Sequence, residues 1–277
     1  EGVWRMAIRM IVTDMDGTLL DVKNGISEAN RAALKEATAM GVHVVIATGR
    51  MYLSALPYAK EIGVTAPIIS CNGALVKTTA GKELFASPIA PNVVREILNC
   101  MKERGWYVQI YTDEGLFFCE RDHRACAYEK SAGVEGKAVG WDGLYALRTR
   151  VFKLLSISDR AEETAARAAE ISCMFEGRVR AVRSKEKYID IMAEGVSKAA
   201  SIERLAASLG ISLREVLALG DSDNDCDMLS AAGIGIAMTT GTPAVRETAD
   251  FLAENGAADG VARAVYTYVL EGKGKKA

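Results

Sequence analysis

Short apolar runs alternate with segments of helical periodicity in the first part of the chain. The runs at 7–12, 42–47 and 67–70 predict buried strands, and the segments 27–40 and 51–62 predict helices between them. Strands that alternate with helices in this way form parallel sheets with crossover helices. The pattern therefore predicts an α/β fold at the start of the chain.

The middle of the chain follows a different pattern, in which the order strand, helix, strand, strand occurs twice. The expected elements are, first, 84–86, 92–104, 106–111 and 116–119 and, second, 152–157, 161–175, 178–182 and 188–192. Consecutive strands without a helix between them pair in antiparallel fashion. We therefore expect a second, α+β domain with an antiparallel sheet.

The α/β alternation returns after Gly195. It predicts helices at 198–209, 225–232 and 243–248 and strands at 216–219, 234–237 and 251–253. The two outer parts, 1–84 and 193–277, are expected to form one Rossmann-like parallel-sheet core with helices on both faces. Residues 85–192 are expected to form an inserted domain, with hinges near 84–88 and 192–196.

The composition is that of a soluble globular protein, with 49% hydrophobic and 25% charged residues among 277. This length favours two domains over one. No segment approaches the roughly 20 apolar residues of a membrane helix, so we expect no membrane association. Thirty-four Lys and Arg residues against 36 Asp and Glu residues give a net charge of -2, which argues against nucleic acid as a partner.

Six cysteines are scattered without a Cys-x-x-Cys pair, and two histidines are too few to complete a zinc site with them. We expect reduced thiols in a cytoplasmic protein that is a monomer or a small homo-oligomer. Residues 1–5 lack the features of a signal peptide, and Met6 is the expected initiator. The Lys- and Gly-rich tail 272–277 is expected to be frayed surface.

Two carboxylates, Asp14 and Asp16, follow the first predicted strand in an Asp-Met-Asp-Gly-Thr run. Ligands of open α/β sheets bind beyond the carboxyl ends of the strands, where Asp14 could attack phosphorus and hold a hard cation. Asp16 could protonate the leaving oxygen and later deprotonate water, and Gly17 permits the tight turn. Taken alone, the run is equally typical of a surface turn at a strand end.

Four aspartates occupy alternating positions in 220–227, directly after the strand predicted at 216–219. Carboxylates in such a loop indicate a divalent-cation site, and Mg2+ is expected because it combines one or two protein carboxylates with waters and phosphate oxygens. We expect Asp221 to be a direct ligand and Asp225 to give outer support. Asp223 and Asp227 are expected to take no part in the metal site.

Three further segments supply groups for a phosphate site. The Thr48 hydroxyl and the Gly49 amide end a strand, where both could donate to phosphate oxygens. Lys198 begins a predicted helix, and its ammonium group would offset the charges of aspartate and phosphate. The pair Asn72-Gly73 follows the third strand. Each segment has an ordinary alternative, namely a strand exit, a solvated lysine and a turn.

Together these segments resemble the motifs of the haloacid dehalogenase-like hydrolases, specifically the Cof-type sugar-phosphatase branch with a large inserted cap of the C2, or IIB, type. The matching residues are Asp14-Met-Asp-Gly-Thr, Thr48-Gly49-Arg50, Lys198 in Gly195-Val-Ser-Lys, and Gly220-Asp221 with Asn224-Asp225. The resemblance covers essentially the whole chain. One departure is Met238-Thr-Thr-Gly241, where relatives commonly carry a Met-Gly-Asn-Ala type loop.

The resemblance implies that Asp14 is the nucleophile and a Mg2+ ligand. It implies that Asp16 is the acid/base and offers its backbone carbonyl to Mg2+, that Asp221 is a ligand, and that Asp225 supports the site. Lys198 is the predicted catalytic lysine. The predicted phosphate- or substrate-binding residues are Thr48, Gly49, Arg50, Asn72, Gly73 and Asn224. In such enzymes the cap closes over the core, excludes water and selects the leaving group.

The sequence thus predicts a Mg2+-dependent phosphatase of small phosphorylated metabolites, such as sugar phosphates, with an aspartyl-phosphate on Asp14. A phosphomutase of the same fold, similar to a phosphomannomutase, is an alternative in which the phosphoryl group returns to sugar. A receiver-like regulatory module also has an acidic Mg2+ pocket, an aspartate and a lysine. The inserted domain and the second carboxylate, Asp16, count against that module, whose acyl phosphate must be long-lived.

Overall fold

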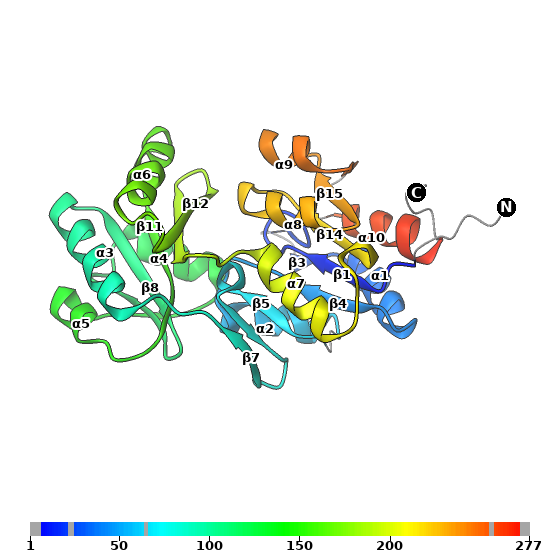
Figure 1. Cartoon of the computed structure of the whole chain (residues 1–277), viewed down its shortest axis with the longest axis horizontal. Helices are drawn as coiled ribbons and strands as arrows, with labels where there is room; N and C mark the ends of the chain where they lie inside the picture. The colour runs from blue at the N-terminus through cyan, green and yellow to red at the C-terminus, as the bar shows by residue number, and fades with distance from the viewer. Residues whose placement is uncertain (1–6, 22–24, 64–65, 255–257, 272–277) are drawn as a thin grey trace.

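The computed structural model describes residues 7–21, 25–63, 66–254 and 258–271, and Figure 1 shows two lobes along its long axis. The expectations for residues 1–5, Met6 and the tail 272–277 lie outside the described residues. One lobe is the core, which contains both ends of the described chain, and the other is the cap. Each lobe has its own large sheet.

The core is built on a five-stranded sheet whose neighbouring strands are all parallel. In spatial order the strands are β16 (Phe251–Ala253), β15 (Ile234–Met238), β14 (Val216–Gly220), β1 (Met10–Thr13) and β4 (His43–Ile46). All but the edge strand β16 are almost wholly buried, as expected for strands covered on both faces. The predicted parallel sheet is therefore confirmed.

Helices surround this sheet (Figure 1). The chain runs from β1 through α1 (Glu28–Ala39) to β4, and from β14 through α8 (Cys226–Ala231) to β15, in opposite directions along the sheet. Right-handed crossovers in opposite directions place their helices on opposite faces. The other core helices are α2 (Tyr52–Glu61), α7 (Lys198–Ser208), α9 (Pro243–Thr248) and α10 (Gly260–Val265), which continues into a π-helical turn at Tyr266–Leu270.

Short strands lead from the core toward the cap. β5 (Ile68–Ser70) lies beside β4 through a parallel bridge between Ala47 and Ile69. It also forms an antiparallel three-stranded sheet with β6 (Leu75–Lys77) and β7 (Glu83–Ala86), after which the chain enters the cap. A small hairpin of β2 (Leu20–Asp21) and β3 (Gly25–Ile26) follows β1.

The cap has a six-stranded, mainly antiparallel sheet. In spatial order its strands are β10 (Gly136–Ala138), β9 (Gly115–Phe118), β8 (Tyr107–Thr112), β11 (Val151–Ile157), β13 (Tyr188–Ala193) and β12 (Val179–Lys185). Its helices are α3 (Pro91–Arg104), α4 (His123–Ala132), α5 (Gly140–Ala146) and α6 (Ala161–Met174). The α+β cap is confirmed, although the sequence pattern assigned no element between 120 and 150.

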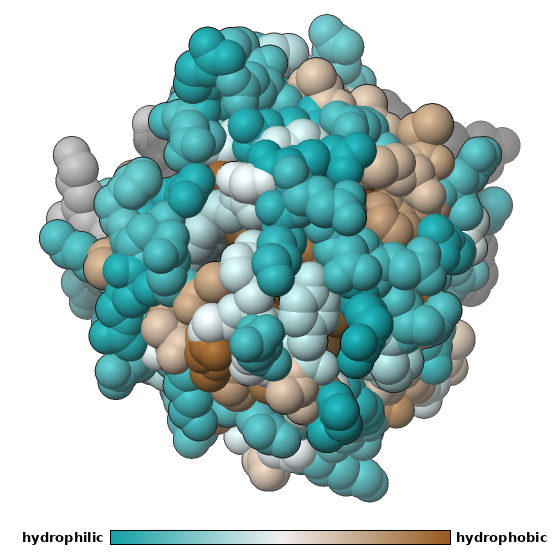
Figure 2. Space-filling view, turned by 90° about the vertical axis from the view of Figure 1, so that its left-hand side faces the viewer, coloured by the Kyte–Doolittle hydropathy of each residue, from teal (hydrophilic) through white to brown (hydrophobic). Residues whose placement is uncertain are grey.

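The two faces of the cap sheet have different neighbours. Val108 and Ile110 of β8 pack in a cluster with α3 and α6, whereas Tyr107 and Tyr111 belong to the cluster that extends through the core. Because successive side chains of a strand point to opposite faces, α3 and α6 cover one face, and the other face, against which α4 packs, is turned to the core. Figure 2 shows the outer end of the cap, which is mostly hydrophilic with a few hydrophobic residues between.

Two expectations from composition can be compared with this fold. None of the helices in the described ranges combines the length and the apolar character that crossing a membrane requires. All six cysteines lie in the described ranges, and each is a free thiol.

Candidate active site at the carboxyl end of the core sheet

The first and last motifs meet where β1 and β14 end. Asp14 directly follows β1, and its backbone N–H donates to Leu219 O of β14 at 2.9 Å. Gly17 turns the chain with a φ of +87°, and a Cβ there would lie 2.5 Å from Asp221 Oδ2. Glycine alone tolerates both the positive φ and this close approach. The turn therefore brings the Asp14 loop against Asp221.

Three carboxylates and one ammonium group form the centre of the site. One oxygen each from Asp14, Asp221 and Asp225 lies within 4.8 Å of the others. Lys198 is buried, and its Nζ donates to Asp14 Oδ1 at 2.5 Å and to Asp225 Oδ1 at 2.6 Å. Thr18 Oγ1 donates to Asp221 Oδ1 at 2.9 Å. Mg2+ prefers carboxylate oxygens, so this set of donors fits the predicted metal.

Asp225 organises the loop after β14. Its Oδ2 accepts hydrogen bonds at 3.0 Å from the backbone N–H groups of Asp221 and Ser222. Asp225 is completely buried, whereas Asp221 is only partly buried. Because one oxygen of Asp225 binds the loop and the other binds Lys198, its geometry fits an outer support better than a direct ligand.

Burial and crowding of like charges shift the pKa values of this cluster. Burial raises the pKa of Asp14 well above its usual value, although Lys198 opposes the shift. Burial and the neighbouring Asp225 raise the pKa of Asp221 to about 6. Burial by itself would lower the pKa of Lys198, but Asp14 and Asp225 raise it overall, so Lys198 remains an ammonium ion. A divalent cation would relieve the repulsion among the carboxylates.

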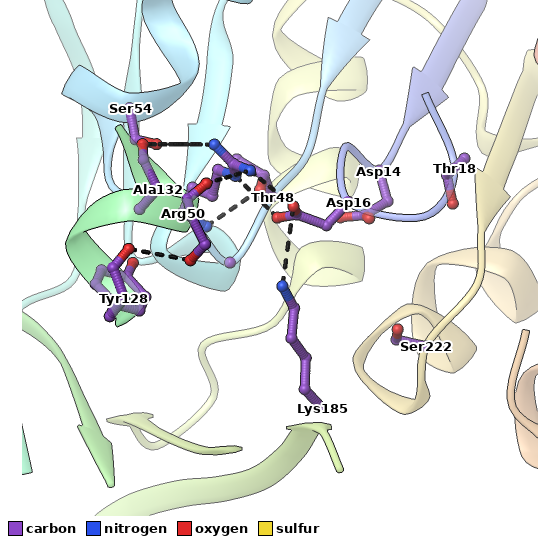
Figure 3. A network of polar contacts seen from close by, with 12 residues as sticks. Asp14, Asp16, Thr18, Thr48, Arg50, Ser54, Tyr128, Ala132, Lys185 and Ser222 are labelled. Carbon is purple, nitrogen blue, oxygen red and sulfur yellow. Dashed lines mark hydrogen bonds and ion pairs between the residues drawn. The ribbon is translucent and has the colours of Figure 1, made fainter. Parts of the chain in front are cut away.

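Asp16 is turned toward Arg50, as Figure 3 shows. Arg50 Nε and Nη2 donate to its two carboxylate oxygens at 2.8 and 2.7 Å. Arg50 also donates to the backbone oxygens of Ser131 and Ala132 at the end of the cap helix α4. Lys185 of the cap lies 3.8 Å from Asp16 Oδ1. Burial alone would raise the pKa of Asp16, but Arg50 and Lys185 lower it overall, so this arrangement favours the carboxylate.

A second set of contacts joins the cap to the loops after β4 and β5. Lys153 Nζ donates to Gly49 O at 2.5 Å and to Asp190 Oδ1 at 3.0 Å. Asp190 Oδ2 accepts from Asn72 Nδ2 at 2.6 Å. Asn72 Oδ1 in turn accepts from Asn224 Nδ2 at 2.9 Å. A continuous polar chain thus runs from the cap to three of the predicted phosphate-binding residues.

Lys153 and Asp190 are contact residues that the sequence pattern did not reveal. Each is a charged residue within an otherwise apolar part of a strand, β11 or β13. Buried charges need partners, so a lone charge in an apolar strand indicates a polar site. That signal could have identified both residues.

Gly73 and the two aspartates that were left out of the predicted metal site, Asp223 and Asp227, contact other parts of the protein. Gly73 lies against α7, where a Cβ would come within 2.3 Å of the backbone oxygen that precedes the helix. Asp223 and Asp227, which were expected to take no part in the metal site, lie outside the carboxylate cluster and contact the cap instead. Arg183 of β12 donates to Asp223 Oδ2, and Arg180 donates to Asp227 Oδ2. These two aspartates bind the cap.

A small cavity of about 50 Å³ lies between the motifs and the cap. The charged residues that line it are Asp14, Asp16, Asp190, Arg50, Lys153 and Lys185. Acidic and basic side chains are thus balanced on its walls. A larger hollow of about 470 Å³ adjoins it on the Asp221 side. The small cavity has room for only a few water molecules, so the cap lies close over the motifs.

A family model of haloacid dehalogenase-like hydrolases matches residues 11–265. The chain is 29% identical to the 5-amino-6-(5-phospho-D-ribitylamino)uracil phosphatase of Bacillus subtilis (strain 168), and the match covers 95% of this chain and 96% of that protein.

Solved structures share the whole architecture. A haloacid dehalogenase-like hydrolase from Bacteroides thetaiotaomicron has a TM-score of 0.82 and 25% identity, over 93% of this chain and 98% of that one. A HAD subclass IIB sugar phosphatase has a TM-score of 0.81 and 22% identity, over 94% and 98%, which shows a common fold. The chain therefore belongs to the haloacid dehalogenase-like hydrolases, as its motifs predicted, and is an enzyme of the phosphatase class.

Proposed function

We propose that the enzyme is a Mg2+-dependent phosphatase of small phosphorylated metabolites, including sugar phosphates, and that Asp14 forms an aspartyl-phosphate. The observation that carries this proposal is the position of the Asp14 carboxylate at a strand end, 2.5 Å from Lys198 Nζ and beside Asp221. Attack on phosphorus needs a carboxylate nucleophile and positive charge near the transferring group. This arrangement supplies the nucleophile and one of the cations.

Mg2+ would be held by Asp14, Asp221 and the backbone carbonyl of Asp16, with Asp225 as outer support. When bound, it supplies charge neutralisation for the transferring phosphoryl group. Lys198 holds Oδ1 of Asp14 and thereby leaves Oδ2 as the attacking atom. Because Lys198 also binds Asp225, it fixes the nucleophile relative to the metal loop.

Phosphate oxygens are bound, in this proposal, by Thr48, Gly49 and the linked amides of Asn72 and Asn224, whereas the side chain of Arg50 binds Asp16 and the cap. Thr48 Oγ1 accepts the backbone N–H of Arg50 at 3.1 Å, which leaves the hydroxyl hydrogen available to a phosphate oxygen. Asn224 lines the cavity beside Asp14. Gly73 packs against α7, and we assign it no contact with phosphate.

Asp16 transfers the protons in this mechanism. Arg50 favours its carboxylate form, which is the form that takes a proton from the hydrolytic water in the second half of the reaction. To protonate the leaving oxygen in the first half, Asp16 must carry a proton and turn toward Asp14. Both changes weaken its two hydrogen bonds with Arg50, which also binds the cap. Cap position and proton transfer are therefore connected through Arg50.

We further propose the boundaries 1–84 with 193–277 for the core and 85–192 for the cap. The last strand before the cap, β7, ends at Ala86, and the last cap strand, β13, ends at Ala193, close to the hinges expected near 84–88 and 192–196.

The free cysteines support a cytoplasmic location, and we propose a monomer or small homo-oligomer. Hydroxylated phosphate esters are the expected substrates, because the Bacillus subtilis relative is named for a phosphorylated ribityl compound.

The test is phosphate release from a panel of sugar phosphates, nucleotides and phosphorylated cofactors, with and without Mg2+. The native enzyme should release phosphate when Mg2+ is present, and Asp14→Asn should not. A mutase would instead yield isomerised sugar phosphate with little free phosphate. Absence of release from every compound, or full activity of Asp14→Asn, would contradict the proposal.

A further inference from the structure

Lys153 and Asp190 form a buried ion pair on the side of the cap that faces the cavity. Their side chains are 4% and 2% exposed, and both residues line the cavity. They belong to the neighbouring strands β11 and β13, where Leu155 is the direct partner of Asp190. The sheet therefore fixes their positions, so the pair is a rigid part of the cavity wall.

The needs of folding do not account for this pair. Desolvation of two charges is costly, and apolar side chains of similar volume often stabilise a protein as well as a buried ion pair does. The residues beside them in the strands, Leu154, Leu155, Ile189 and Ile191, are all buried and apolar. Charges retained within such strands and next to a reaction centre indicate a role in binding.

The pair keeps hydrogen-bonding capacity for a ligand. An ammonium group has three N–H donors, and Lys153 uses two of them, on Gly49 O and Asp190 Oδ1. Among the described residues, Nζ makes no third hydrogen bond, and the centre of the Tyr111 ring lies 4.4 Å from it. Asp190 accepts two hydrogen bonds, from Lys153 and Asn72, of the roughly four that a carboxylate can accept. One donor and two acceptor positions thus remain.

The pair also lies next to the proposed phosphate site. Lys153 holds the carbonyl of Gly49, the residue that follows Thr48. A Cβ at Gly49 would be 3.3 Å from Asp190 Oδ2, so the carboxylate lies directly against this loop. Groups in this position would contact the carbon atoms of the leaving alcohol that lie nearest the phosphate, and the hydroxyl groups on them.

We propose that Lys153 and Asp190 recognise hydroxyl groups of the leaving alcohol and thereby select phosphate esters of polyols and sugars. The inference rests on the proposed phosphatase function and adds the residues that determine specificity. A hydroxyl both donates and accepts a hydrogen bond, so it matches an ammonium donor beside a carboxylate acceptor. An alkyl group in the same place would displace water from both charges and offer no replacement.

The test compares ribitol 5-phosphate with n-pentyl phosphate, which has the same carbon chain without hydroxyls. The variant combines Lys153→Met with Asp190→Asn, because removal of both charges leaves neither unpaired in the cap. We expect the native enzyme to prefer ribitol 5-phosphate, and the ratio of the two kcat/KM values to fall at least about tenfold in the variant. Since each ratio is measured within one protein, it does not depend on the folded fraction.

If the ratio of the two kcat/KM values is unchanged, whether or not both values fall, the inference is overturned, because the pair would then act only in cap closure. The matched control combines Arg180→Gln with Asp227→Asn, which removes a cap–core ion pair of 3.0 Å outside the cavity. It should change both kcat/KM values alike. A native enzyme that hydrolyses both esters equally well would contradict the inference alone, whereas one that hydrolyses no phosphate ester would contradict the proposed function itself.

Discussion

In the proposed mechanism Asp16 acts as an acid and as a base, and Arg50 sets the balance between its two forms. Two N–H groups of Arg50 bind both oxygens of Asp16, which stabilises the carboxylate. A lysine would offer one compact ammonium group in place of this planar fork. The contact is thus specific to arginine.

We expect Arg50→Lys to raise the pKa of Asp16 toward its ordinary value, because one of two charge-assisted hydrogen bonds is lost. Carboxyl 13C NMR titration of Asp16 would measure the change. Arg31→Lys is the control, since Arg31 forms an exposed ion pair with Glu61 and neither residue lines the cavity. An Asp16 pKa that is the same in the native enzyme and in Arg50→Lys would show that Arg50 does not set its protonation.

The raised pKa values of Asp14 and Asp221 also predict how stability depends on pH. Both carboxyls have an ordinary pKa of 3.8, and that of folded Asp221 is about 6, so the folded state binds more protons between these values. The free energy of unfolding therefore decreases as the pH rises through this window. We expect a lower Tm at about pH 7.5 than at about pH 5.5 in EDTA, and a larger Mg2+ stabilisation at the higher pH.

Calorimetry at the two pH values, with EDTA and with Mg2+, would measure these differences. Asp221→Asn is the matched variant, because it removes one titrating group and should reduce the pH dependence. A Tm in EDTA that is higher at about pH 7.5 than at about pH 5.5 would contradict the expected sign.

Strand β12 is the element through which the cap binds the acidic loop of the core. Arg180 and Arg183 each form an ion pair of 3.0 Å, with Asp227 and Asp223 respectively. Both pairs are partly exposed, so each contributes only about 1 kcal/mol or less. Together they favour the closed position of the cap without locking it.

Replacement of both arginines, Arg180→Gln with Arg183→Gln, should therefore raise KM by about 2- to 5-fold for all substrates. The dependence of KM on ionic strength should also become weaker, because screened ion pairs are lost. Steady-state kinetics across a salt series would measure both effects. Arg178→Gln, which removes a surface pair with Glu96 inside the cap, should leave them unchanged. Identical salt curves for the double variant and the native enzyme would argue against this role of β12.

The elements differ in how well the sequence predicts them. Strands β1 and β14 are buried on both faces, so each appears as an uninterrupted apolar run that is easily recognised. Helix α4 buries three residues and α5 buries one, and neither leaves an apolar periodicity that could be detected. The same applies to the site: Asp14 and Asp221 follow strand ends, whereas Lys153 and Asp190 become partners only when β11 and β13 assemble.

On the scale of the whole molecule, the cap lies close over the core, and Asp14 is only 6% exposed beneath it. The cavity beside Asp14 has room for only a few water molecules, fewer than a sugar phosphate would displace, although a hollow of about 470 Å³ adjoins it. We infer that the cap moves away in each turnover, and that the contacts of Arg50, Lys153 and β12 form again over the substrate.

In the proposed mechanism the phosphoryl group of the substrate is transferred to the carboxylate of Asp14 before water releases it. The native enzyme is mixed with Mg2+ and a sugar phosphate that it hydrolyses, and the reaction is quenched in acid within one turnover. Peptide mass spectrometry should then find one phosphoryl group on Asp14. Asp14→Asn should carry none and should lose at least about 10³-fold in kcat. Rapid turnover with the phosphoryl group on another residue, or undiminished turnover by Asp14→Asn, would contradict the account.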